Sequence, residues 1–351
     1  MDTHLFKIRE KGKFGFIDKT GTVVIEPQYL YAEDFHNGFS NVRLNNKLVP
    51  LDCLGRLLMK NLFNYVGTYE DGLAKVQLVN KWGFIDEKGS KRIDIQFDDA
   101  SDFSEGLAAV SVDGLWGYIN KSGELIIDLQ FHAAGDFKNG MAPVCSEQDG
   151  PYSYIDNQGN QKIEALFDKA YNFQNGVAVV ERFGRWGLIN DAGKDLIRPQ
   201  FDVEESYESG MIYEDMAVII INERYGFLRS DGTVIVEPTF EFAGDFNEGC
   251  ALIETEDGFG YIDKEGKELI KPQFQDAGMF SNGLAQVFMG DAWGFIDKSG
   301  QVVIDCKYDE VDAFKNGLAL VKKDGSWQYI DTDGNSVWKE NEVSERIALG
   351  G

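Results

Sequence analysis

Short apolar runs alternate with polar turns along the whole chain, and residues 107–127, LAAVSVDGLWGYINKSGELII, show the pattern most clearly. Leu107–Val112, Trp116–Asn120 and Glu124–Ile127 are β-compatible runs of four to six residues. Asp113-Gly114 between the first two runs is a strong two-residue hairpin signal, and a Lys-Ser-Gly turn separates the second from the third. The pattern predicts a three-stranded antiparallel meander.

This unit recurs along the chain, and an aromatic residue followed by Gly marks its second strand. The pair, or a degenerate form of it, stands at Phe14-Gly15, Leu48-Val49, Trp82-Gly83, Trp116-Gly117, Tyr152-Ser153, Trp186-Gly187, Tyr225-Gly226, Phe259-Gly260, Trp293-Gly294 and Trp327-Gln328. Successive pairs are 34, 34, 34, 36, 34, 39, 34, 34 and 34 residues apart. A fixed period of this length is typical of solenoids, propellers and arrays.

We therefore predict an all-β fold in which ten three-stranded meander units of about 34 residues form one continuous array over residues 1–338. Residues 339–351 are expected to be a polar C-terminal tail. Many propellers close by sharing one blade between the two termini, whereas this chain has whole units at both ends. An open β-solenoid or superhelix is therefore expected, and a closed propeller-like ring is the alternative.

The residues of the turns and connectors predict their local backbone conformation. The second turn carries Gly in all ten units, with Asp or Asn three positions earlier in nine of them, which favours an Asx turn closed by a left-handed Gly. In the connector before Leu107, Phe97, Ala100 and Phe103 recur every three residues, which suggests a short helical turn. An aromatic anchor and, three residues later, a Gly recur in all nine connectors; Gly210 is the sixth of these glycines.

The second strand predicts where the rings lie. In WGFID, Trp82 and Phe84 point to one face while Gly83 and Ile85 point to the other, so both faces are small or apolar and the strand should be covered on both sides. The Gly beside the ring allows another backbone to approach closely. The alternative is an exposed ladder of rings that stacks ligands along the array.

The net charge of the chain limits the classes of partner that it can bind. With 34 basic and 59 acidic side chains, the formal net charge is 34 − 59 = −25, which disfavours nucleic acid and anionic membranes as partners. No signal-peptide pattern and no run of about 18 apolar residues is present, so we expect a cytoplasmic, soluble and monomeric protein. The four cysteines form no CxxC pair and are expected to be buried small side chains.

No pattern in the chain indicates catalysis. The three histidines fall at different places in the repeat, and no HExxH, GxSxG or Gly-rich phosphate loop occurs. The acidic turn residues supply too few oxygens for calcium. We therefore expect a protein that is not an enzyme and that has no metal site and no cofactor.

The segments GLWGYINKSGELII, KWGFIDEKG and WGFIDKSGQVVI resemble the WG-repeat (KWG-type) proteins of bacteria, from about residue 5 to 338. That resemblance implies a repeat array without common catalytic residues. The hairpin pattern from Gly114 to Gly123 is also similar, more weakly, to choline-binding cell-wall repeats, in which stacked β-hairpins hold a quaternary ammonium between exposed rings.

Three functions remain open. The first is a non-catalytic scaffold that binds another protein, such as a basic toxin; the second is a binder of glycan or choline-like ligands; the third is an unrecognised hydrolase. The best candidate for specificity is the break in the period after the sixth connector, because the array does not require it. The five extra residues there, which we predict to form a partner-binding loop, are Met211, Ile212, Tyr213, Glu214 and Asp215.

Overall fold

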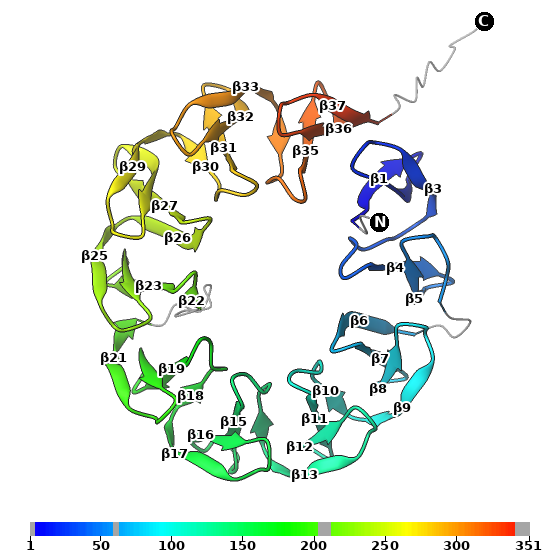
Figure 1. Cartoon of the computed structure of the whole chain (residues 1–351), viewed down its shortest axis with the longest axis vertical. Helices are drawn as coiled ribbons and strands as arrows, with labels where there is room; N and C mark the ends of the chain where they lie inside the picture. Colours follow the sequence, from blue (N-terminus) through cyan, green and yellow to red (C-terminus); the bar gives the residue numbers. More distant parts are fainter. Residues whose placement is uncertain (1–3, 59–62, 203–211, 341–351) are drawn as a thin grey trace, which may run out of the picture.

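The computed structural model describes residues 4–58, 63–202 and 212–340, and all the regular structure in these ranges is β-strand. Ten antiparallel sheets follow one another around a ring (Figure 1). Each sheet contains one of the predicted units, and no sheet closes on itself into a barrel. The predicted tandem array of ten β-meanders is confirmed.

Eight sheets have four strands, and in each of them strand order follows the sequence. The connector strands, which lie innermost in the ring (Figure 1), are β6 Tyr65–Glu70, β10 Asp99–Ala100, β14 Ala133–Ala134, β18 Lys169–Ala170, β22 Ile212–Tyr213, β26 Phe242–Asn247, β30 Asp276–Ala277 and β34 Glu310–Val311. The first meander strands are β7 Leu73–Leu78, β11 Leu107–Val112, β15 Met141–Cys145, β19 Val177–Arg182, β23 Met216–Ile221, β27 Cys250–Thr255, β31 Leu284–Met289 and β35 Leu318–Lys323.

The two remaining strands of each meander lie further out. The second strands are β8 Lys81–Asp86, β12 Leu115–Asn120, β16 Tyr152–Asp156, β20 Arg185–Asn190, β24 Arg224–Arg229, β28 Gly258–Asp263, β32 Ala292–Asp297 and β36 Ser326–Asp331. The third strands, on the rim of the ring, are β9 Lys91–Phe97, β13 Leu125–Phe131, β17 Gln161–Phe167, β21 Asp195–Asp202, β25 Val234–Phe240, β29 Glu268–Phe274, β33 Val302–Tyr308 and β37 Ser336–Lys339.

The first two sheets are smaller. The first has three strands, β1 Phe6–Glu10, β2 Lys13–Ile17 and β3 Val23–Tyr29, with β1 innermost. The second has two, β4 Phe39–Leu44 and β5 Lys47–Asp52, extended by isolated bridges such as Leu48 to Phe63.

The connectors differ from the prediction of a helical turn. Between the third and fourth units, Phe97 ends β9, Ala100 belongs to the connector strand β10, and Phe103 follows in an irregular segment. Ala100 pairs with Val110 of the first meander strand. The spacing of three therefore comes from a short strand between a bend at Asp98 and an irregular segment, and the connector adds a fourth strand to the predicted three.

The second meander strand is covered on both sides, as predicted. Tyr118 and Ile119 are both buried on β12 although they point to opposite faces. A Cβ on Gly117 would lie 2.5 Å from the carbonyl oxygen of Ile127, where β13 bulges toward β12. Gly117 is thus required because a backbone crosses it, which is the close approach that the sequence predicted.

Pairs of aromatic rings join consecutive units. Each second meander strand in these pairs carries a ring on the residue that follows the Gly position of the aromatic-Gly pair. This ring packs against the anchor ring of the next connector, with the two ring centroids 4.7–5.1 Å apart. These pairs are Phe16–Phe35, Phe84–Phe103, Tyr118–Phe137, Tyr154–Phe173, Phe227–Phe246, Tyr261–Phe280 and Phe295–Phe314. The rings at this position are buried and hold the units together. Trp82, Trp116 and Trp293, in the aromatic-Gly pairs themselves, are half-buried.

The second turns also contact the neighbouring unit. In most of them the Asx oxygen accepts the N–H groups two and four residues later, as Asn120 does from Ser122 and Glu124 at 3.0 Å each. Gly123 closes the turn with φ +84°. A Cβ on Gly123 would meet Ile93 of the preceding unit at 3.4 Å, so the turn packs on the third strand of its neighbour.

The first and last sheets pack against each other, and we call this junction the seam. Phe6 and Ile8 of the first sheet share a buried cluster with Leu318 and Tyr329 of the last. The Tyr329 hydroxyl donates to the carbonyl oxygen of Lys7 over 2.9 Å. A ring pair and a tyrosine hydroxyl bond join these two units, as they join internal neighbours. The arrangement is therefore the closed ring that was the alternative, in place of the open superhelix that was expected. Closure comes from packing between two units, with no strand shared between them.

Candidate functional site

The structure describes four of the five predicted site residues, two of them in a strand and two in a turn. Met211 lies outside the described residues. Ile212 and Tyr213 form β22 and pair with Ala217 and Met216 of β23. Ile212 is buried in the core, whereas the Tyr213 side chain is 41% exposed. The described part of the segment is thus a hairpin strand, not the predicted loop, because Ile212 has an apolar pocket to fill between units.

Glu214 and Asp215 form the turn that follows β22. Their φ angles of 51° and 74° match those of Glu248 and Gly249, 53° and 81°, at the next connector. Asp215 therefore occupies the connector position that the sequence assigned to Gly210. Asp is one of the residues that can adopt this left-handed conformation. Ser230 donates its N–H to the Asp215 carbonyl and its hydroxyl to the Asp215 carboxylate.

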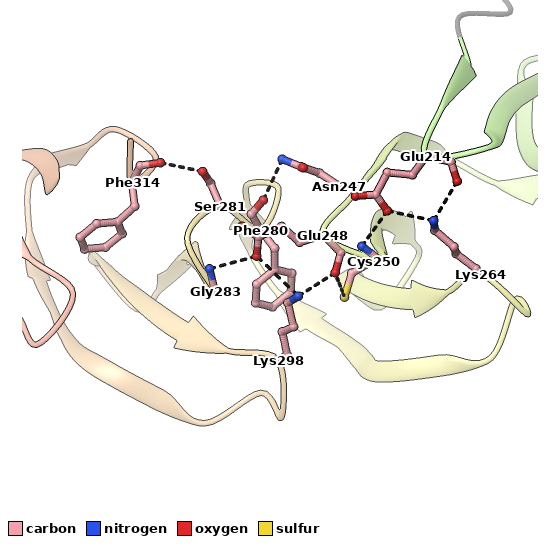
Figure 2. A network of polar contacts seen from close by, with 11 residues as sticks. Glu214, Asn247, Glu248, Cys250, Lys264, Phe280, Ser281, Gly283, Lys298 and Phe314 are labelled. Atoms are coloured by element: carbon pink, nitrogen blue, oxygen red, sulfur yellow. Dashed lines mark hydrogen bonds and ion pairs between the residues drawn. The ribbon is translucent and has the colours of Figure 1, made fainter. Parts of the chain in front are cut away.

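Glu214 is a contact between units (Figure 2). Its carboxylate accepts the N–H of Gly249 at 2.8 Å and lies 3.1 Å from Lys264 Nζ, which also donates to the Glu214 carbonyl at 2.8 Å. Burial alone would raise the pKa of Glu214, but the bonds from Lys264 and Gly249 outweigh it and lower the pKa. The same contacts recur one unit on, between Glu248, Gly283 and Lys298.

We call this repeated set of bonds the junction network, and it extends beyond Figure 2. Asp71 accepts the N–H of Gly106 at 2.8 Å, and Asn282 accepts that of Gly317 at 2.6 Å. A second bond runs beside the first, for example from the Ser281 hydroxyl to the Phe314 carbonyl at 2.6 Å (Figure 2). The sequence did not reveal the network because its acceptor varies among Asp, Glu and Asn, although each stands directly before the connector Gly or, at Glu214, before Asp215.

The role predicted for the segment after the sixth connector stays a prediction, and the structure changes how it must be tested. Deleting the segment would remove Glu214 from the junction network and Ile212 from the core, so a loss of binding could follow from misfolding. Tyr213 is the described member with the most exposed apolar surface. Tyr213→Ala is therefore the informative variant.

Two of the hollows among the described residues lie between units. One, with a volume of about 960 Å³, lies between the fourth and sixth units and is lined mainly by polar side chains, including Asp113, His132, Glu147 and Lys169. The other, of about 580 Å³, lies at the seam and combines rings with charged side chains. Rings and cations line the seam hollow at Phe14, Trp327, Trp338, Lys7, Arg9 and Lys322.

Chemistry-bearing side chains do not converge elsewhere in the described ranges. No group of three His, Cys, Asp or Glu residues is placed there so as to hold a metal ion. The four cysteines are unpaired; Cys145 and Cys250 are buried, and Cys53 and Cys306 are half-buried. The same ranges contain no helix long and apolar enough to cross a membrane.

A family model for the WG containing repeat matches this chain seven times, at residues 14–47, 82–116, 116–148, 152–182, 225–258, 259–291 and 293–327. The chain belongs to the WG-repeat family. Each match begins at the first residue of an aromatic-Gly pair or of its degenerate form, and each of these residues lies in a second meander strand. No curated protein matches the sequence of this WG-repeat protein.

One solved structure is similar in fold to the WG-repeat protein at low sequence identity. A crystal structure of a eukaryotic initiation factor has a TM-score of 0.53 and 10% identity, and the match covers 85% of this chain and 94% of that chain. The match with AztD of Citrobacter koseri covers 96% of this chain and 94% of that chain at 12% identity, with a TM-score of 0.35. The first likeness supports the fold and carries no information on function.

Proposed function

We propose that this WG-repeat protein is a non-catalytic scaffold that binds a second, basic protein, such as a toxin that it neutralises. The observation that supports the proposal is a concentration of exposed carboxylates at one end of the sheets, which we call the acidic end. They stand in the turns between first and second meander strands and at the starts of connectors: Asp98, Asp99, Asp113, Glu147, Asp149, Asp168, Glu223, Glu241, Glu256, Asp257, Asp276, Asp291, Asp309, Glu310 and Asp324.

Bonds within the sheets hold part of this surface in place. Asp98 accepts the N–H of Asp113 at 2.8 Å, which ties the start of a connector to the neighbouring hairpin turn. The hydrogen bond from Lys81 is the main reason that the pKa of Asp98 lies below its ordinary value. The same type of bond runs from Gly325 to Asp309 at 3.3 Å. Asp98 and Asp309 are therefore held in fixed positions at the acidic end.

The scaffold proposal follows from how the repeat distributes its residues. Rings and turn glycines are used for packing between units, so the exposed turn residues are free to vary without loss of the fold. A ring of repeated acidic positions suits a large cationic protein surface, because complementary charge steers encounter and excludes acidic competitors. The aromatic-ladder function has less support, since rings such as Tyr118 and Tyr261 are buried between units.

The test removes four charges at the acidic end. The variant combines Asp113→Asn, Asp257→Asn, Asp291→Asn and Asp324→Asn, all in exposed turns. A partner captured from the native host is purified, and its affinity for wild-type protein and variant is measured at several salt concentrations. Screening shortens the reach of surface charges to about 8–10 Å near physiological salt, so we expect weaker wild-type binding as salt rises and a smaller salt dependence for the variant.

A matched control removes the same charge from the other end of the sheets. Glu87→Gln, Asp191→Asn, Glu265→Gln and Asp333→Asn change exposed residues of the second turns. This control is expected to bind the partner like wild type. If both variants bound the partner equally weakly, net charge alone would explain the loss of affinity. That result would overturn the assignment of binding to the acidic end.

A further inference from the structure

In the described ranges, the inner edge of β1 in the first sheet is uncovered, whereas connector residues pair with the corresponding edge in the other sheets. In the last sheet the connector strand β34 pairs with β35, with Glu310 opposite Lys322 and Val311 opposite Val321. Lys322 in turn lies opposite Trp327 across the hairpin. Arg9 of β1 lies opposite Phe14 in the same way, so Arg9 and Ile8 are the counterparts of Lys322 and Val321. Within the described ranges no strand pairs with β1 from the inner side.

The hollow at the seam follows this edge. Lys7, Ile8 and Arg9 all line it, although alternate side chains of a strand point to opposite faces. Three successive residues can face one hollow only along the edge of the strand. Trp327 and Trp338 of the last sheet line its other side. Its volume of about 580 Å³ therefore lies where the other sheets hold a connector strand.

A hydrogen bond at the seam spans the same position. At an internal junction the Tyr261 hydroxyl donates to the carbonyl of Gly278 in the connector, at 2.7 Å, and the Gly278 N–H donates to Gln286 of the first meander strand, at 2.9 Å. At the seam the Tyr329 hydroxyl donates directly to Lys7, the counterpart of Gln286. The connector residue that normally stands between the two is absent from this chain of bonds.

The neighbouring anchor position at the seam is already filled. Tyr329 packs against Phe6 with centroids 5.6 Å apart, in the role that connector rings play at internal junctions. An added segment therefore needs to supply only the strand that pairs with Ile8 and Arg9, without an aromatic anchor of its own.

Charge indicates what such a strand should carry. In the last sheet Lys322 Nζ lies 2.6 Å from Glu310 of the connector strand. Its counterpart Arg9 is exposed, and its guanidinium lies 5.4 Å from the centre of the Phe14 ring. The three connector strands Asp99–Ala100, Asp276–Ala277 and Glu310–Val311 share an acidic residue followed by a small apolar one.

We propose that the inner edge of β1 binds an extended peptide segment of a partner protein, in which an acidic residue opposite Arg9 is followed by a small apolar residue opposite Ile8. The segment adds to the first sheet as its fourth strand, and main-chain hydrogen bonds supply affinity while the acidic side chain supplies specificity. This site goes beyond the proposed function, since it is a strand edge that takes an acidic segment, whereas the acidic end presents turn carboxylates to a basic protein.

The probe is a fluorescent peptide with the sequence of residues 307–313, KYDEVDA, acetylated and amidated at its ends. Its binding to the full-length protein is followed by fluorescence anisotropy. In the last sheet the Asp309 N–H donates to the Lys322 carbonyl at 2.8 Å, so N-methylation of that peptide amide should remove a main-chain bond and weaken binding. Unchanged binding of the methylated peptide would exclude strand addition.

A charge exchange tests the specificity. The sixth sheet already shows the reverse pairing, in which Lys169 of the connector strand lies 3.5 Å from Glu181. Arg9→Glu should therefore weaken binding of the Glu310 peptide by roughly tenfold or more. It should also create binding of a peptide in which Lys replaces that Glu. Lys88→Glu, at an exposed second turn, is the matched control and should leave both affinities unchanged.

The outcomes decide the proposal separately from the proposed function. No binding of either peptide, or an Arg9→Glu protein that does not prefer the Lys peptide, would refute it. Self-association that the peptide does not displace would show that a second copy is the occupant, which also refutes it. A variant with only the Asp113→Asn, Asp257→Asn and Asp291→Asn changes of the acidic end leaves the residues that line the seam hollow intact. It is expected to bind the peptide like wild type, so either proposal can fail alone.

Discussion

The Tyr118 hydroxyl offers a sensitive test of the junctions, because a single oxygen joins two units. Tyr118 is fully buried, which raises the pKa of its phenol, and it donates to the Gly135 carbonyl at 2.8 Å. Tyr118→Phe removes this bond with little change of shape, since Phe84 and Phe295 occupy the same position in other units.

The expected cost is about 1 kcal/mol, the usual net contribution of a hydrogen bond. It should stay below the penalty for an unsatisfied buried carbonyl, because Gly135 is half-exposed and water can reach it. Repeat proteins can unfold unit by unit, so hydrogen exchange read by mass spectrometry is the suitable assay. A loss of about 1 kcal/mol corresponds to about fivefold faster exchange of amides around Tyr118 and Gly135.

Two comparisons make this prediction decisive. Tyr65→Phe changes a 40% exposed ring and should leave exchange unaltered. Tyr329→Phe removes the equivalent bond at the seam and should speed exchange near Lys7 by the same factor as Tyr118→Phe does at its own junction. Exchange that is unchanged in Tyr118→Phe would show that the hydroxyl carries no stabilising bond, and the description of the junctions would be wrong.

Three further predictions concern packing, charge and backbone approach. Phe137→Ala should cost about 3–5 kcal/mol in local unfolding free energy, because the ring is 1% exposed and packs on Tyr118; a cost under about 1 kcal/mol would contradict its role as an anchor. Because the pKa of Glu214 is lowered below 4.5, its stabilisation is fully present above pH 4.5 and is lost as pH falls through the lowered value. Glu214→Gln should abolish this part of the pH dependence of unfolding, and an unchanged profile would exclude the contribution. Gly117→Ala should lower the melting temperature, because the new Cβ would overlap the Ile127 carbonyl, and a variant as stable as wild type would refute that contact.

The repeat itself could be predicted because it depends on local chemistry. A left-handed Gly123 and an Asx acceptor at Asn120 are properties of single turns, and both stand at fixed positions in the sequence. The covering of both faces of β12 could also be read from apolar residues at successive positions. These features are decided within one unit, so one unit was enough to predict them.

Ring closure could not be predicted in this way. It depends on the angle between successive sheets, summed over ten junctions, and no residue type determines that angle. The expected sign of closure, a blade shared between the termini, is absent because Phe6 and Tyr329 close the ring by packing. The sequence contains both rings but gives no reason to place them together.

The position of the extra residues was ambiguous for a related reason. Glycine at a left-handed position is a strong signal, so the connector turn was assigned to Gly210. The structure uses Glu214 and Asp215 for that turn, with Asp215 at φ 74°. Because Asp can adopt this conformation, a pattern based on glycine alone put the break in the period on the wrong side of Ile212.

The closed ring is the central claim, and a distance across the seam tests it most directly. In a variant without the four native cysteines, spin labels are attached at Lys19 and Asn335, which are exposed residues in the second turns of the first and last units. Ser90 and Lys121 are the matched pair at an internal junction. Pulsed electron paramagnetic resonance is expected to give the same short distance distribution for both pairs. A long or broad distribution for Lys19 and Asn335, beside a short one for Ser90 and Lys121, would show that the array is open and would contradict the ring.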